Sequence, residues 1–155
     1  MTYDEILIEM EQAGLEVREL PLRASDGLIH GRKVAIRQDI PTQTEKAQVA
    51  AEELAHHRTA AGDLSDYTDP NSWKLEVKGR RLSYDIMIGL SGLVKCYEKG
   101  CRSAAEAADV LDVTPQFFAE AIDYYRAKHG RCARLGGYLI FFEPALSVLK
   151  LMEVE

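Results

Sequence analysis

The stretch AAEELAHHRTAAGD, residues 50–63, carries two carboxylates and two histidines at helical spacing. Glu52 and His56 lie four residues apart, so on a helix they project from the same face, and Glu53 lies one step round. Zinc peptidases with a His-Glu-x-x-His helix use this arrangement, but here glutamate replaces the first histidine. Glu53 and His57 form a second pair at the same spacing, and periodicity alone does not decide which pair faces inward. The alternative is an ordinary helix with charged residues on its solvent-facing side.

Capping boxes and turn residues predict where the other elements of the first half begin and end. Threonine or serine followed three residues later by glutamate satisfies free N–H groups at a helix start, and glycine often follows a helix end. We therefore expect a helix from Thr2 to Gly14, a short strand at 15–22, a β-hairpin at 25–41 that turns at His30-Gly31, a helix from Thr42 to about Ala60, and a polar loop at 62–72.

The second half of the chain predicts mainly helix. We expect a helix from about Trp73 to Gly89, a helical continuation to Gly100, a helix capped by Ser103 and Glu106, a helix from Thr114-Pro115 to Gly130, and a last strand in LGGYLIFFEP (135–144) with its turn at Gly136-Gly137. This order predicts an α+β fold in one domain, 1–155. A small antiparallel or mixed sheet and the candidate active-site helix occupy 1–72, a helical bundle 73–130 and a terminal strand segment 131–155.

Composition excludes several classes of protein. The net charge of −6 argues against general nucleic-acid binding, because neutralising phosphates needs a basic surface. The cysteines at 96, 101 and 132 are odd in number and lack Cys-x-x-Cys spacing, which predicts reduced thiols. No apolar run reaches the ~18 residues of a membrane span, and the acidic first residues are unlike a signal peptide. We expect a cytoplasmic protein without a membrane partner.

A third metal ligand could come from the helix after the polar loop. Glu76 lies near the start of that helix, and Arg80 and Tyr84 follow on the same face. Arg80 could orient a carboxylate, and Tyr84 could donate a hydrogen bond to a developing oxyanion. In the alternative interpretation Arg80 forms a surface ion pair with Glu76, and Tyr84 is a half-buried core residue.

These segments together resemble the ImmA/IrrE-type metallopeptidases. The resemblance lies in GLIHGRKVAIRQDIP followed by VAAEELAHHRTAAGD, then in LEVKGRRLSYDIMI, and finally in CRSAAEAADVLDVTPQFFAEAIDYYRAKHG and YLIFFEP. It extends over nearly the whole chain, and it implies a zincin-like active-site helix packed on the small sheet. The last two segments are similar to the C-terminal parts of members encoded by phages and mobile elements.

The resemblance also implies roles for individual residues. His56 and Glu76 become metal ligands, Glu52 takes the place of the first ligand, and Glu53 is the general base, with Arg80 and His57 beside the site. The departures from the family are Glu52 for histidine, Ala55 for glycine, Gly79 for alanine and Leu82 for an aromatic residue. Two carboxylates and one imidazole can still hold Zn²⁺, with Mn²⁺ or another divalent ion as the alternative. Because two anionic ligands offset more of the ion's charge, we expect weaker zinc binding and modest or absent peptidase activity.

Two functions follow from the resemblance, and a third from the C-terminal helices. The first is a metal-dependent endopeptidase-like regulator that cleaves or inactivates a helix-turn-helix repressor of a phage or mobile element. The second is a pseudopeptidase that binds such a repressor without cutting it. The third is a DNA-binding regulator, because SAAEAADVLDVTPQFF has a helix-turn-helix pattern. The acidic recognition helix, with Glu120 and Asp123 before its first arginine, argues against direct DNA binding.

Overall fold

The computed structural model describes residues 1–59 and 72–152, and it confirms the α+β class. The chain divides into two compact units, 1–87 and 88–155, and each is described here by itself. The polar loop expected at 62–72 lies outside the described residues, except for Ser72, which begins a helix. The organisation as a single domain stays a prediction.

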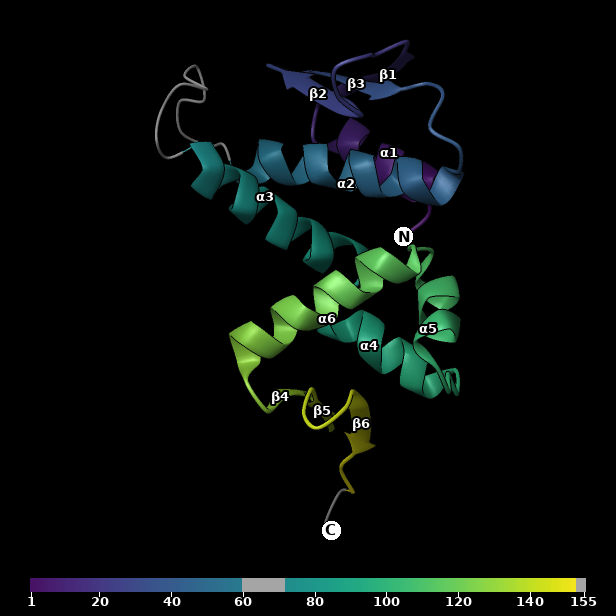
Figure 1. The fold of residues 1–155 in the computed structure, drawn as a ribbon, viewed down its shortest axis with the longest axis vertical. Coiled ribbons are helices and arrows are strands. Elements are labelled where there is room, and N and C mark those ends of the chain that lie inside the picture. The colour runs from purple at the N-terminus through teal and green to yellow at the C-terminus, as the bar shows by residue number, and fades with distance from the viewer. Residues whose placement is uncertain (60–71, 153–155) are drawn as a thin grey trace. The chain divides into compact units, whose positions relative to one another are not determined.

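The described residues of the first unit, 1–59 and 72–87, form three helices and three strands (Figure 1). They are α1 (Tyr3–Gln12), β1 (Glu16–Leu20), β2 (Gly27–His30), β3 (Lys33–Arg37), α2 (Gln43–Thr59) and α3 (Ser72–Met87). The capping box at α1 is complete, because the Thr2 hydroxyl accepts from the Glu5 N–H and the Glu5 carboxylate accepts from the Thr2 N–H. At α2 the Thr42 hydroxyl accepts from the Glu45 N–H at 3.1 Å, as the sequence predicts.

The N-terminal sheet is mixed and has the strand order β1-β3-β2. The predicted hairpin is confirmed: β2 runs antiparallel to β3, with Gly31 in the turn at a φ of 61°. β1 pairs in parallel with the far side of β3, in register from Glu16 opposite Lys33 to Leu20 opposite Arg37. β2 therefore forms one edge of the sheet and β1 the other.

One face of this sheet packs on α1 and α2, and α3 packs on α2 (Figure 1). Alanines at 47, 50, 51 and 55 are fully buried on α2, and their small side chains let neighbouring elements approach the helix closely. β3 contributes Val34 and Ile36 to the same core. α2 is thus enclosed by elements on two sides, which brings its polar side chains against β2 and α3.

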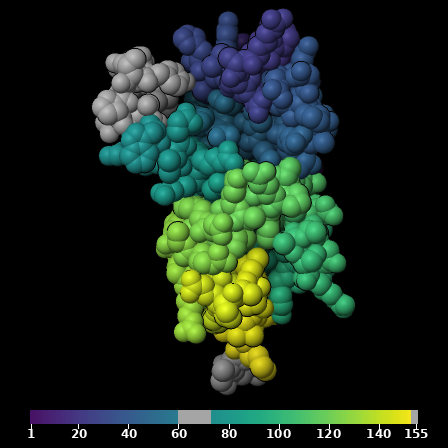
Figure 2. All heavy atoms as spheres, viewed as in Figure 1, coloured from purple at the N-terminus to yellow at the C-terminus, as the bar shows by residue number. Residues whose placement is uncertain are grey.

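The second unit consists of α4 (Gly89–Glu98), α5 (Ala104–Leu111) and α6 (Pro115–His129), followed by β4 (Cys132–Leu135), β5 (Tyr138–Phe141) and β6 (Ser147–Lys150). The expectation of a single late strand is wrong, because β5 is the centre of a three-stranded antiparallel sheet with the order β4-β5-β6. The turn at Gly136-Gly137 is confirmed. In Figure 2 the yellow C-terminal strands lie against the green helices of this unit.

The aromatic face of α6 forms the core of the second unit. Phe117, Phe118, Ile122 and Tyr125 are buried, and Tyr125 lies beside the buried Phe142. The Thr114 hydroxyl accepts from the Phe117 N–H at 3.2 Å and caps the helix as predicted. The apolar side chains of this helix therefore serve packing. Among the described residues, no helix is long and apolar enough to cross a bilayer.

Candidate metal centre

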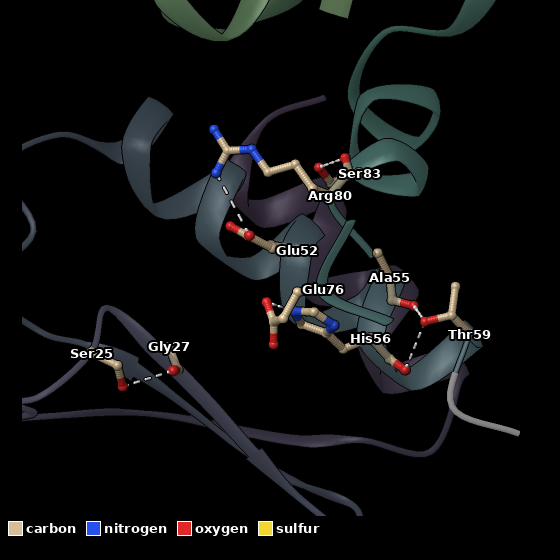
Figure 3. A network of polar contacts seen from close by, with 9 residues as sticks. All are labelled: Ser25, Gly27, Glu52, Ala55, His56, Thr59, Glu76, Arg80 and Ser83. Carbon is tan, nitrogen blue, oxygen red and sulfur yellow. Dashed lines mark hydrogen bonds and ion pairs between the residues drawn. The ribbon is translucent and has the colours of Figure 1, made fainter. Parts of the chain in front are cut away.

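Three side chains from α2 and α3 converge in the first unit (Figure 3). Glu52 and His56 project from the face of α2 that packs on α3, and Glu76 projects from the first half of α3. Each can offer one ligand atom, and these atoms all lie within 4.8 Å of one another. His56 Nε2 lies 3.5 Å from a Glu76 carboxylate oxygen. The spacing of four residues on α2 and the packing of α3 therefore bring together the three residues predicted as ligands.

A glycine on α3 makes room for the His56 ring. A Cβ atom placed on Gly79 would lie 2.5 Å from His56 Nδ1 and 2.6 Å from Cε1, closer than real atoms approach. The ring therefore lies directly on the α3 backbone, with Nδ1 towards Gly79 and Nε2 towards Glu76. The His56 side chain keeps only 16% of its surface exposed. Its orientation is fixed by packing, which preserves Nε2 as the atom available to a ligand.

Glu53 lies on the adjacent side of α2, against β2. A Cβ on Gly27 would lie 2.7 Å from a Glu53 carboxylate oxygen and 2.8 Å from a methyl carbon of Val49. Glu53 is only 8% exposed. Burial, reinforced by the negative charges of Glu52 and Glu76, raises the pKa of Glu53 from 4.5 to about 7. A carboxylate with a pKa near neutrality can both accept and release a proton at physiological pH.

Arg80 connects Glu52 with Tyr84 one turn further along α3. Its guanidinium lies 3.6 Å from a Glu52 carboxylate oxygen, and its Nε donates to the Tyr84 hydroxyl at 3.3 Å. The backbone carbonyl of Arg80 accepts from the buried Ser83 hydroxyl at 2.5 Å. Arg80 therefore lies beside the carboxylate of Glu52, and its role in orienting that carboxylate stays a prediction.

The donor set suits a divalent cation. Two carboxylates and one imidazole are ordinary ligands of zinc and manganese. In a tetrahedral zinc site with bonds of about 2.0–2.2 Å, neighbouring ligand atoms are roughly 3.4 Å apart. The 3.5 Å between His56 and Glu76 already matches that value. The remaining adjustment falls on Glu52 and Glu76, whose side chains are 30% and 60% exposed.

The other predicted site residues lie near this group in different ways. Tyr84 is buried and meets the site through Arg80. His57 is half-buried and lies outside the candidate group found among the described residues. His30 is exposed at the end of β2, as expected for a residue in the hairpin turn.

Sequence reasoning missed the part played by two glycines, Gly27 and Gly79. Each leaves space for one side chain of the site, Gly27 for Glu53 and Gly79 for His56. Gly79 did leave a signal, because it stands where the resemblance has alanine. Gly27 left no signal that distinguishes it from an ordinary glycine at the start of a strand.

Comparison of the chain with protein-family models, with curated proteins and with solved structures gives no match.

Proposed function

We propose that the first unit binds a divalent cation through Glu52, His56 and Glu76, and that the protein is a metal-dependent endopeptidase-like regulator of the ImmA/IrrE type. The observation that carries this proposal is the arrangement of His56, fixed against Gly79 with Nε2 towards Glu76, beside a buried glutamate of raised pKa. Zn²⁺ is the first candidate ion, and Mn²⁺ the second, because carboxylates suit harder ions better than imidazoles do.

Within this proposal the residues of the chain have separate tasks. A cation held by Glu52, His56 and Glu76 would supply Lewis-acid polarisation of a scissile carbonyl and of a water molecule. The Glu53 carboxylate would accept a proton from the attacking water and pass it to the leaving amine. Its position against the β2 backbone keeps the carboxylate in a poorly solvated environment, so the proton is held with a pKa of about 7. Arg80 forms an ion pair with Glu52, for which it competes with the cation, and donates a hydrogen bond to Tyr84.

The sheet offers a place for an extended peptide. β2 is an edge strand, and its Gly27 lies directly against Glu53. A substrate strand that adds to the free edge of β2 would form backbone hydrogen bonds and pass beside Glu53. The substrate class is therefore an extended segment of a partner protein. The resemblance adds the identity proposed for this partner, a helix-turn-helix repressor of a phage or mobile element.

A second candidate function keeps the binding and omits the cleavage. The observation that favours it is the contact of Arg80 with Glu52 at 3.6 Å. A guanidinium beside the first ligand carboxylate neutralises part of the charge that would attract a cation. In this case the protein is a pseudopeptidase that binds the repressor without cutting it, and the β2 edge remains the docking strand.

Metal content and cleavage together test both functions. The purified full chain is dialysed against Zn²⁺ or Mn²⁺, its bound metal is measured, and its cleavage of candidate repressors is followed by mass spectrometry. The endopeptidase function predicts one ion per chain and cleavage that Glu53→Gln abolishes while repressor binding is retained. The pseudopeptidase function predicts binding without cleavage for both proteins. A chain that takes up no ion and cuts no repressor contradicts the endopeptidase function, and a chain that also binds no repressor contradicts the pseudopeptidase function.

A further inference from the structure

The second unit contains a pair of cysteines at the end of α4. Helix α4 ends at Glu98, and Gly100 follows with a φ of 74°. The Gly100 N–H donates to the Tyr97 carbonyl, and the Cys101 N–H donates to the Cys96 carbonyl, each at 3.0 Å. This pair of hydrogen bonds defines a Schellman motif, in which the side chains of the two outer residues come into contact. Here both outer residues are cysteines.

The two thiols differ in their surroundings. Cys101 acts electrostatically on Cys96 and contributes to its raised pKa, and the Cys96 thiol donates weakly to the Ala107 carbonyl at 3.8 Å. Cys96 is 6% exposed, whereas Cys101 is partly exposed in the connection between α4 and α5. Burial raises the pKa of Cys96 to about 11. Cys101 is therefore the more accessible of the two cysteines, and Cys96 is the buried one.

Both cysteines line one cavity of about 450 Å³ within this unit, together with Arg102, Leu93, Phe118 and Ile122. The cavity gives a small oxidant access to the partly exposed Cys101. An accessible thiol with a second thiol beside it is the arrangement of a reversible cysteine oxidation site.

We propose that Cys96 and Cys101 form a reversible disulfide, which makes the end of α4 a site of modification by hydroperoxides. The Cys101 thiolate attacks one peroxide oxygen, the O–O bond breaks, and hydroxide leaves to give a sulfenic acid. The Cys96 sulfur then attacks the Cys101 sulfur, forms the S–S bond and displaces the second hydroxide. The two thiols lose two electrons and two protons, and hydrogen peroxide is reduced to two water molecules.

The bond would join the last turn of α4 to the segment that leads into α5. Both partners already lie on the wall of one cavity, so oxidation would fix that wall covalently without moving the elements far. The third cysteine, Cys132, is exposed on β4 and serves as an internal control, because its sulfur has a similar chemistry without the Schellman geometry. Reduced thiols, expected from the sequence, are the starting state of this site.

Oxidation of the full chain by hydrogen peroxide, followed by alkylation, intact mass and peptide mapping, tests the proposal. The wild type and Cys132→Ser are expected to lose two hydrogens, to yield a peptide pair linking Cys96 with Cys101, and to recover on reduction. Cys101→Ser is expected to form no such bond. Cys96→Ser is expected to accumulate a sulfenic acid at Cys101 that dimedone traps.

Two results would overturn the proposal. One is peroxide treatment that oxidises Cys132 while Cys96 and Cys101 remain fully alkylated in the wild type. The other is an equal loss of hydrogens in wild type and Cys101→Ser. Circular dichroism before oxidation establishes that each variant is folded, and Cys101→Ser keeps the test decisive if the buried Cys96→Ser change disrupts the unit.

Discussion

The imidazole of His56 lies so close to Gly79 that a single added methyl group would overlap it, at 2.5 Å from Nδ1. The contact joins α2 to α3 at the point where Glu52, His56 and Glu76 converge. One helix therefore supplies the imidazole, and the other supplies both a carboxylate and the flat backbone surface on which the ring lies. The geometry of the candidate centre depends on this contact as much as on the ligand atoms.

Replacing Gly79 by alanine tests that contact, because the contact decides whether the substitution stabilises or destabilises the folded protein. At an unobstructed helical position, glycine to alanine stabilises a protein by up to about 1 kcal/mol. At 79 we expect destabilisation of about 1–3 kcal/mol, because the methyl group must displace His56 or separate the helices. Urea unfolding measures the change. Lys78→Ala, at the exposed neighbouring position, is the matched control, and a Gly79→Ala protein more stable than wild type would refute the expectation.

Loss of the imidazole or of the α3 carboxylate is expected to remove stabilisation by divalent cations. A ligand at one hundred times its dissociation constant stabilises the folded state by about 2.7 kcal/mol. Saturating Zn²⁺ or Mn²⁺ should therefore raise the Tm of the wild type, and His56→Ala and Glu76→Gln should abolish the rise. His57→Ala, one residue along α2 and outside the group, should retain it. An equal Tm rise in the His56 and His57 variants would show that the ion binds elsewhere.

The raised pKa of Glu53 makes the metal-free protein less stable as the pH increases. A carboxyl with a folded-state pKa of about 7, against 4.5 in the unfolded chain, favours folding fully below pH 4.5, and this advantage is lost as the pH rises towards 7. The loss amounts to roughly 3 kcal/mol. Unfolding in chelator between pH 4.5 and pH 8 measures it.

The glutamine variant isolates the contribution of Glu53. Glu53→Gln cannot ionise, so its stability should change less over that range and should exceed that of the wild type at pH 8. Glu11→Gln, on the exposed side of α1, is the matched control and should follow the wild-type curve. Parallel curves for the Glu53 variant and the wild type would assign the pH dependence to other groups.

Arg80 is expected to compete with a cation for Glu52. Its side chain is 44% exposed and its guanidinium lies 3.6 Å from the carboxylate, a pair worth at most about 1 kcal/mol. Arg80→Gln should therefore tighten cation binding by up to about fivefold in calorimetric titration. Arg81→Gln, the next residue on α3, leaves the Glu52 pair intact and serves as control. Weaker cation binding by Arg80→Gln would mean instead that Arg80 orients Glu52 for the ion.

Local sequence signals predicted the local structure well. The Thr114-Pro115 cap and Gly130 delimit α6, and the His30-Gly31 turn forms the β2–β3 hairpin, because these elements depend on neighbouring residues. Local signals did not predict the parallel pairing of β1 with β3, because this pairing depends on contacts between segments distant in the sequence. β4 and β6 were missed because each has four residues, largely exposed, and forms a strand only beside β5.

The candidate site shows the same division between local and distant contacts. The spacing of Glu52 and His56 predicted a shared face, and the structure places Glu76 on the helix that packs against that face. Which carboxylate turns inward could not be read from α2 alone. Burial of Glu53 follows from the absence of a side chain at Gly27, and this residue lies on a strand that only the folded chain brings next to α2.

The close fit at His56 and Gly79 also limits how this chain can diverge. In this structure a side chain at 79 would overlap the His56 ring, so it becomes acceptable only when the ring moves off the α3 backbone or a smaller residue replaces His56. The two positions should therefore change together among descendants of one ancestor, and the same rule links Glu53 with Gly27. Such coupled substitutions would distinguish lineages that kept an imidazole between α2 and α3 from those that abandoned it, even where the surrounding residues have drifted.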